Sequence, residues 1–128
     1  MQMPQIVVYE KDGRLKLQLE PLAEERRWAL REVRQPEACL RLLARGGPTV
    51  LVLKVGRDLE REFALLERAT WLYPDAPTVV VADGDRPDLA GLAWDLGAAC
   101  VLLPPQPRER LPEIVGGLMG GPAEANKG

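Results

Sequence analysis

The sequence predicts an α/β domain in which a doubly wound, five-stranded parallel sheet lies between two layers of helices. Three observations support this fold class. Short apolar runs recur along the chain, segments with helical periodicity separate them, and each connection is long enough to hold a helix. Crossovers between parallel strands are right-handed in almost all proteins, so this order of elements builds one sheet, with any ligand beyond the carboxyl ends of its strands.

Five segments are expected to form the strands. Residues 6–9 (IVVY), 49–55 (TVLVLKV), 78–82 (TVVVA) and 100–103 (CVLL) are apolar almost throughout. Continuous apolar runs of this length are typical of parallel strands that helices cover on both faces. Residues 28–33 (WALREV) alternate between apolar and polar side chains, which favours a strand at the edge of the sheet.

Three connecting segments carry the apolar stripe of a surface helix. Residues 36–45 begin with Pro36, which suits a first helical turn, and stop before a pair of glycines. Residues 58–73 end before a proline, which cannot continue a helix. Residues 88–96 end before Gly97, a natural position for a left-handed C-cap.

Two further segments are harder to assign. The leucine spacing of residues 14–27 fits a helix, but the alternation also fits a strand, and Pro21 would bend a helix there. Residues 108–119 are expected to form a poor helix because a proline and a pair of glycines interrupt them. We expect one domain over residues 1–119, and we expect residues 120–128 (GGPAEANKG) to be a disordered tail or the start of a linker.

The composition excludes several classes of function. The 128 residues carry a formal net charge of −2 without a block of like charge, so we expect no nucleic-acid or membrane partner. The apolar runs are far shorter than the ~20 residues that span a bilayer, which favours a cytoplasmic protein. The chain has no histidine, and this rules out imidazole catalysis and imidazole metal ligation. Cys39 and Cys100 lie far apart in apolar segments, so buried free thiols are expected.

Two stretches of the chain resemble the response-regulator receiver (CheY-like) family. Residues 71–105 (WLYPDAPTVVVADGDRPDLAGLAWDLGAACVLLPP) are similar to the family's third helix, fourth strand, fourth helix and fifth strand. Residues 36–53 (PEACLRLLARGGPTVLVL) are similar to its second helix and the strand that carries the phosphoacceptor. The resemblance covers residues 5–119 and implies a flavodoxin-like (βα)5 three-layer sandwich with a role in bacterial signal transduction.

The family uses five positions to move a phosphoryl group from a histidine kinase to an aspartate. They are a pair of acids for Mg²⁺, the acceptor aspartate ending the third strand, a Thr or Ser ending the fourth, and a Lys ending the fifth. The corresponding residues here are Glu10, Lys11, Lys54, Ala82 and Pro104, so one acid is kept and four positions are chemically disabled. The resemblance therefore implies a pseudo-receiver without a phosphoacceptor aspartate. We expect no bound metal, no cofactor and no enzymatic activity.

The lysine at the acceptor position has two interpretations. A buried acid without a cation is costly, so we expect the Lys54 ammonium to take the place of the metal ion, paired with Glu10 and with Asp12. In the alternative interpretation, the Lys54 side chain simply reaches solvent at the end of its strand.

Without phosphoryl chemistry, the domain is expected to be a phosphorylation-independent regulatory or protein-interaction domain. The resemblance implies that a protein partner, or a second copy in a homodimer, binds the face formed by the fourth helix, fifth strand and fifth helix. Leu92, Trp94 and Val101 are the candidate residues of that surface.

Two other functions remain open. An orthodox phosphorelay receiver could use a displaced loop aspartate, for which Asp58, Asp83 and Asp85 are candidates on the same rim. A flavodoxin-like small-molecule-binding module would need an open pocket at the strand ends, and Ala82, Pro104 and Pro105 make that rim unpromising.

Overall fold

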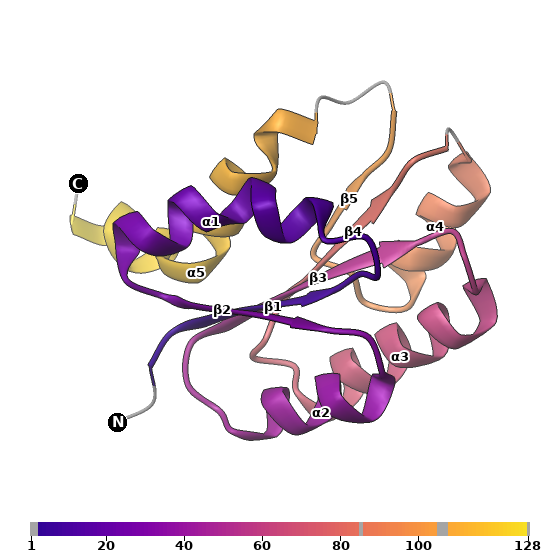
Figure 1. The fold of residues 1–128 in the computed structure, drawn as a ribbon, viewed down its shortest axis with the longest axis horizontal. Coiled ribbons are helices and arrows are strands. Elements are labelled where there is room, and N and C mark those ends of the chain that lie inside the picture. Colours follow the sequence, from indigo (N-terminus) through magenta and orange to yellow (C-terminus); the bar gives the residue numbers. More distant parts are fainter. Residues whose placement is uncertain (1–2, 85, 105–107, 128) are drawn as a thin grey trace.

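Parallel strands and helices alternate along the chain in the computed structural model, which describes residues 3–84, 86–104 and 108–127 (Figure 1). The strands are β1 (Gln5–Tyr9), β2 (Ala29–Val33), β3 (Thr49–Val55), β4 (Thr78–Ala82) and β5 (Cys100–Leu102). The helices are α1 (Arg14–Arg26), α2 (Pro36–Ala44), α3 (Leu59–Leu72), α4 (Pro87–Asp95), a short 3₁₀ turn η1 (Arg108–Arg110) and α5 (Leu111–Lys127).

One parallel sheet contains all of these strands in the order β2-β1-β3-β4-β5. Within it, Tyr9 is in register with Leu53, and Val55 is in register with Ala82. The next residues along β1 and β4 therefore emerge beside the end of β3. This register brings Glu10, Lys54 and Asp83 together at the carboxyl end of the sheet.

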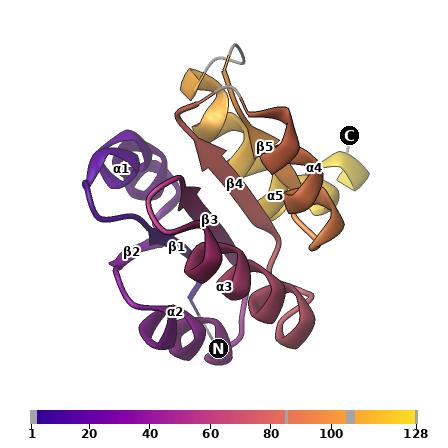
Figure 2. The ribbon, with the colours of Figure 1, turned by 90° about the vertical axis from the view of Figure 1, so that its right-hand side faces the viewer.

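Helices cover both faces of the sheet (Figures 1 and 2). On one face α1 and α5 bury a cluster that includes Ile6, Val52 and Leu111, and on the other face α2, α3 and α4 bury a cluster that includes Leu53, Phe63 and Ala93. The middle strands are therefore buried on both sides, which explains why their sequences are almost continuously apolar. The expected doubly wound, three-layer α/β fold is confirmed.

The segment with two possible assignments forms helix α1. Leu15 and Leu19 are fully buried because they are four residues apart on the helix face that meets the sheet, whereas Leu17 is exposed on the opposite face. Pro21 is accommodated inside the helix. The prediction of an edge strand is also confirmed, since β2 lies at one edge of the sheet and is only half-buried.

The last helix differs from the expectation of a poor helix over residues 108–119. The backbone of α5 is helical from Leu111 to Lys127, past residue 119. Pro112 lies in the first helical turn, where a missing N–H costs nothing. Leu111 and Val115 of α5 pack in the same buried cluster as Leu15 and Leu19 of α1, and this packing supports the helix. The glycine pair therefore does not end α5.

Candidate functional site

The candidate site lies where β1, β3 and β4 end, and it is built around one buried carboxylate. Glu10 follows β1 directly, and its side chain is only 1% exposed. Its Oε1 atom accepts a hydrogen bond of 2.7 Å from the backbone N–H of Leu15, which fixes the first turn of α1. Its Oε2 atom is also buried and has no hydrogen-bond donor among the described residues. This oxygen therefore needs a nearby positive charge.

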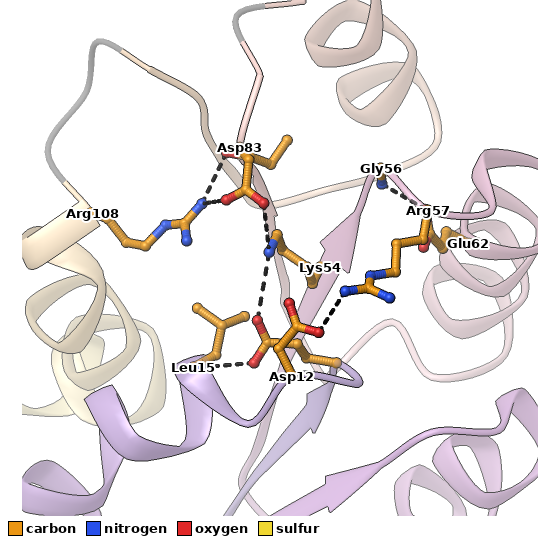
Figure 3. Close-up of polar contacts among 10 residues, drawn as sticks. Asp12, Leu15, Lys54, Gly56, Arg57, Glu62, Asp83 and Arg108 are labelled. Atoms are coloured by element: carbon orange, nitrogen blue, oxygen red, sulfur yellow. Dashed lines mark hydrogen bonds and ion pairs between the residues drawn. The ribbon is translucent and has the colours of Figure 1, made fainter.

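Lys54 supplies that charge from the neighbouring strand. The side chain of Lys54 is 11% exposed, and its Nζ atom lies 3.5 Å from Glu10 Oε2 and 3.0 Å from Asp83 Oδ2. Figure 3 shows the ammonium group between the Asp83 carboxylate and the start of α1. The expected pairing of Lys54 with Glu10 is present, and the side chain does not extend into solvent. The second acid is Asp83 and not the expected Asp12, which instead accepts a hydrogen bond of 2.7 Å from Arg57.

A second cation reaches the same cluster from the far side. Arg108 Nη2 donates hydrogen bonds to Asp83 Oδ1 at 2.6 Å and to the carbonyl oxygen of Ala82 at 3.1 Å. These hydrogen bonds hold the pKa of the Asp83 carboxyl below its usual range. The bond from Arg108 has the largest effect, and the bond from Lys54 has a smaller effect in the same direction. The Arg108 carbonyl accepts from Gln18 Nε2 at 2.6 Å, which ties η1 to α1.

Sequence reasoning missed the role of Arg108. A usable signal was present, because a cation that follows β5 by a few residues belongs to a loop at the carboxyl edge of the sheet. The family pattern instead predicts a cation at position 104, at the end of the fifth strand. Pro104 is half-buried after β5 and has no charge, so the cation of this edge comes from further along the chain.

Glu62 was also missed, and it holds the loop between β3 and α3. This buried carboxylate accepts hydrogen bonds from the backbone N–H groups of Gly56 at 2.8 Å and Asp58 at 3.3 Å. The Asp58 side chain in turn accepts from the N–H of Arg61 at 3.2 Å and caps α3. Gly56 has a φ of 135°, a backbone conformation that favours glycine. The sequence signal for this role was an acidic residue at a position that belongs to the apolar stripe of the helix.

The remaining predicted positions lie around this cluster. Lys11 is on the exposed rim, and Ala82 is buried at the end of β4, where it offers a backbone carbonyl and no hydroxyl. Of the loop aspartates, Asp58 caps α3 and Asp83 binds the two cations. Outside the described residues lie Asp85 and Pro105.

The donor set does not fit the Mg²⁺ ion of receiver domains. Such an ion requires several carboxylate or carbonyl oxygens in octahedral geometry. At this edge the acceptor position presents the Lys54 ammonium, which lies against both Glu10 and Asp83. Among the residues that the structure describes, no group of three or more Asp, Glu, Cys or His side chains is placed to hold a metal ion.

An open cavity of about 400 Å³ adjoins the cluster. Its wall combines charged groups with the apolar side chains of Leu59 and Leu89, and the ring of Tyr9 forms part of it. Burial raises the pKa of the Tyr9 phenol. This finding corrects the expectation of an unpromising rim: Ala82 has a small side chain and leaves space at the strand ends, and Pro104 is not part of the wall.

The three candidate residues of the partner surface do not share one environment. Leu92 and Trp94 are 43% and 51% exposed on α4, as a binding surface requires. Val101 is only 7% exposed, because β5 directs its side chain into the core beneath α3 and α4. Val101 is therefore a core residue, and its assignment to the surface was wrong.

The fold matches solved structures, whereas two sequence comparisons found no match. No family model and no curated protein matches the chain. A response regulator from Thermotoga maritima is 20% identical over 93% of this chain and 99% of its own, with a TM-score of 0.74. A CheY-like receiver domain protein from Methanospirillum hungatei JF-1 is 16% identical over 99% of this chain and 100% of its own (TM-score 0.73). The receiver domain of a signal transduction histidine kinase from Syntrophus aciditrophicus is 18% identical over 92% of this chain and 91% of its own, with a TM-score of 0.72.

At these identities the likeness concerns the fold. It confirms the expected CheY-like arrangement of a five-stranded parallel sheet between helices. The described part of the chain contains no helix that is both long and apolar enough to cross a bilayer. What the domain does must be argued from its own site.

Proposed function

We propose that this domain is a phosphorylation-independent, receiver-like regulatory domain of bacterial signal transduction, without enzymatic activity. One observation carries the proposal. Lys54 lies near the carboxyl end of β3, where receivers carry their acceptor aspartate, and its ammonium group lies between Glu10 and Asp83. An amine cannot form an acyl phosphate, and the cation occupies the place in which a metal ion would have to bind.

The ion cluster also supports a fixed conformation. Lys54 and Arg108 together hold Asp83 and the carbonyl of Ala82, so the loop after β4 is tied to β3 and to η1. Receivers switch by moving a hydroxyl residue at the end of β4 towards the phosphoryl group. Ala82 has no hydroxyl, so the loop is held by charges that are part of the chain itself.

The output of such a domain would be a protein contact. We propose the face formed by α4, β5 and α5 as the surface for a protein partner or a second copy. Leu92 and Trp94 are both exposed on α4, on either side of the buried Ala93. Partial exposure of an aromatic and an aliphatic side chain on one helix supports this assignment. The cytoplasmic location stays a prediction.

Treatment with acetyl phosphate and Mg²⁺, followed by intact mass measurement, tests the proposal. We expect no gain in mass, whereas a receiver with an intact acceptor aspartate, treated in parallel, gains one phosphoryl group. A gain of one phosphoryl by this domain would overturn the proposal. The same treatment of Asp83→Asn would then identify the acceptor, because a displaced acceptor at Asp83 predicts that the gain is lost in this variant.

The cavity at the carboxyl edge favours a second candidate function, the binding of a small polar molecule. It is about 400 Å³ in volume, and charged groups from three loops converge on it. A thermal-shift screen with small dicarboxylates, nucleotides and amino acids at millimolar concentration tests this function. A ligand that stabilises the wild type and not Arg61→Ala, in which one cation of the wall is removed, would support it. No stabilisation by any compound of the screen would count against it.

A further inference from the structure

A groove lies at the end of the sheet opposite to the ion cluster. It runs between the carboxyl ends of α3 and α4, has a volume of about 480 Å³, and includes Trp71, Thr70 and Leu96 in its wall. We call it the Trp71 groove. Both helices end there, so the groove lies at the amino edge of the sheet, away from Lys54. It is also separate from the exposed Leu92 and Trp94, neither of which lines it.

The floor of the groove is rigid. Thr70 Oγ1 donates a hydrogen bond of 2.7 Å to the carbonyl oxygen of Leu96, which joins the ends of the two helices. Gly97 follows with a φ of 105°, and a Cβ at this position would lie 3.0 Å from the Thr70 side chain. The close approach therefore depends on glycine, and the shape of the groove exists before any partner binds.

Trp71 offers an unused aromatic surface at this groove. It is 82% exposed, the highest value among the exposed large hydrophobic side chains. Tryptophan is the aromatic side chain that attracts a cation over its ring most strongly. The chain makes such a contact elsewhere, where the Arg26 guanidinium lies 5.5 Å from the centre of the Trp28 ring.

The charges around the groove have one sign. Glu67 and Asp95 belong to its wall, and no lysine or arginine does. The carboxyl end of a helix carries a partial negative charge, which a basic side chain in the last turn usually offsets. Neither α3 nor α4 has a basic residue in its last turn. Two carboxylates and the carboxyl ends of two helices therefore make the electrostatic potential negative beside the Trp71 ring.

We propose that the Trp71 groove binds an arginine-bearing segment of a protein partner. The planar guanidinium group would stack on the Trp71 ring and lie between the carboxylates of Glu67 and Asp95. Arginine fits this setting better than lysine because it stacks on aromatic faces and binds carboxylates through paired N–H groups. The prolines and the aliphatic wall of the groove would receive the residues that flank the arginine. This proposal is independent of the chemistry at Lys54.

A matched pair of peptides tests the proposal. The probes are acetyl-Pro-Arg-Pro-amide and acetyl-Pro-citrulline-Pro-amide, which differ in charge and hardly in shape. The readout is the indole N–H signals in the NMR spectrum of the ¹⁵N-labelled domain. We expect the arginine peptide to shift the Trp71 signal saturably at millimolar concentration, with the Trp94 signal unchanged. The citrulline peptide should leave both signals in place.

Variants locate the binding site. Because variants at position 71 lack the Trp71 indole signal, their binding is followed by the backbone N–H signals of Thr70 and Gly97 in the same spectrum. Trp71→Ala should weaken the arginine peptide about fivefold, as expected for a cation–aromatic contact at an exposed site, and Trp71→Phe should weaken it less. Glu67→Gln combined with Asp95→Asn should weaken it to a similar extent. Trp94→Ala removes a half-exposed tryptophan outside the groove and is the matched control, with no change expected. Thermal unfolding of each variant checks that it remains folded.

Several results would overturn the proposal. Equal binding of the two peptides would remove the role of the charge, and equal weakening by Trp94→Ala would remove the role of this groove. A Trp71 signal that shifts with protein concentration in the absence of peptide would show that a second copy occupies the groove, which also contradicts the proposal. The acetyl phosphate experiment tests the proposed function, and the peptide experiment tests the Trp71 groove. Each proposal can therefore fail without affecting the other.

Discussion

Each end of the sheet contains a buried polar side chain that needs a partner, and the two ends provide that partner with different chemistry. At the amino end, the buried Gln5 donates to the Leu42 carbonyl at 3.0 Å and to Thr49 Oγ1 at 3.2 Å. At the carboxyl end, the buried Glu10 depends on the Lys54 ammonium at 3.5 Å. Neutral groups lose little when water is removed, whereas buried ions lose several kcal/mol each. Among the described residues, the buried charged side chains are Glu10 and Glu62, and both lie at the carboxyl end, where this fold places its functional groups.

Removing the cation should have the largest effect. Lys54→Met leaves the Glu10 carboxylate buried without a counter-ion, so we expect the free energy of unfolding to fall by about 3 kcal/mol in urea denaturation. The double variant Lys54→Met with Glu10→Gln is the control. It keeps an acceptor for the Leu15 N–H but no charge, and it should be more stable than the single variant. An unchanged stability of Lys54→Met would remove the internal-cation interpretation.

The neutral end should respond less. Gln5→Ala leaves the Leu42 carbonyl without its side-chain donor and removes two hydrogen bonds, which should cost about 2 kcal/mol in the same denaturation experiment. Replacing both partners with apolar residues, as Gln5→Leu with Thr49→Val, should recover part of this loss. A loss larger than that of Lys54→Met would contradict the distinction between the two ends.

A glycine pair on and beside α4 tests the rigidity of the amino end. Gly97→Ala combines a positive φ with a contact of 3.0 Å to Thr70, so a loss of about 1–2 kcal/mol is expected. Gly91→Ala is the matched control inside α4, where a Cβ meets nothing within 4 Å, and it should stabilise the domain by about 0.5–1 kcal/mol. Thermal unfolding measures both, and equal effects would contradict the close packing of α3 and α4.

The smallest effect is expected from the exposed acid of the cluster. Since Arg108 and Lys54 lower the pKa of Asp83 in the folded state, this carboxylate stabilises the fold at pH values above its usual pKa of 3.8. The contribution is lost as the pH falls below that value through the folded-state pKa. Wild type and Asp83→Asn should therefore differ in stability at pH 6, and the difference should shrink progressively as the pH falls below 3.8. A constant difference over this range would show that Asp83 does not act through its charge.

The fold was predictable because its signals are local and repeated. The runs in β1, β3 and β4 are buried on both faces, and this alone makes their sequences apolar throughout. The course of α5 was not predictable from its glycines. Glycine lowers helix propensity, but the apolar side chains of α5 pack against α1, and this contact comes from a distant part of the chain.

The candidate site was predictable only in part. The pairing of Lys54 with Glu10 was expected because a buried acid needs a nearby cation, and the register of β1 with β3 brings the two residues together. The contacts of Asp83 and Arg108 depend on how two loops fold over the sheet edge, and loop paths carry no periodic signal. Val101 was misplaced for another reason: a short apolar strand does not reveal which of its side chains face the core.

The pairing of β1 with β3 has a consequence for how the chain avoids misfolding. Tyr9 is aligned with Leu53, so the glutamate and the lysine occupy the next matched positions of two adjacent strands. A slip by one residue would turn every side chain of a strand to the opposite face and separate the two opposite charges. The carboxylate would then be isolated in the interior, a penalty that only misaligned chains incur. The ion pair of Glu10 and Lys54 therefore favours the correct register of β1 and β3 over a shifted one.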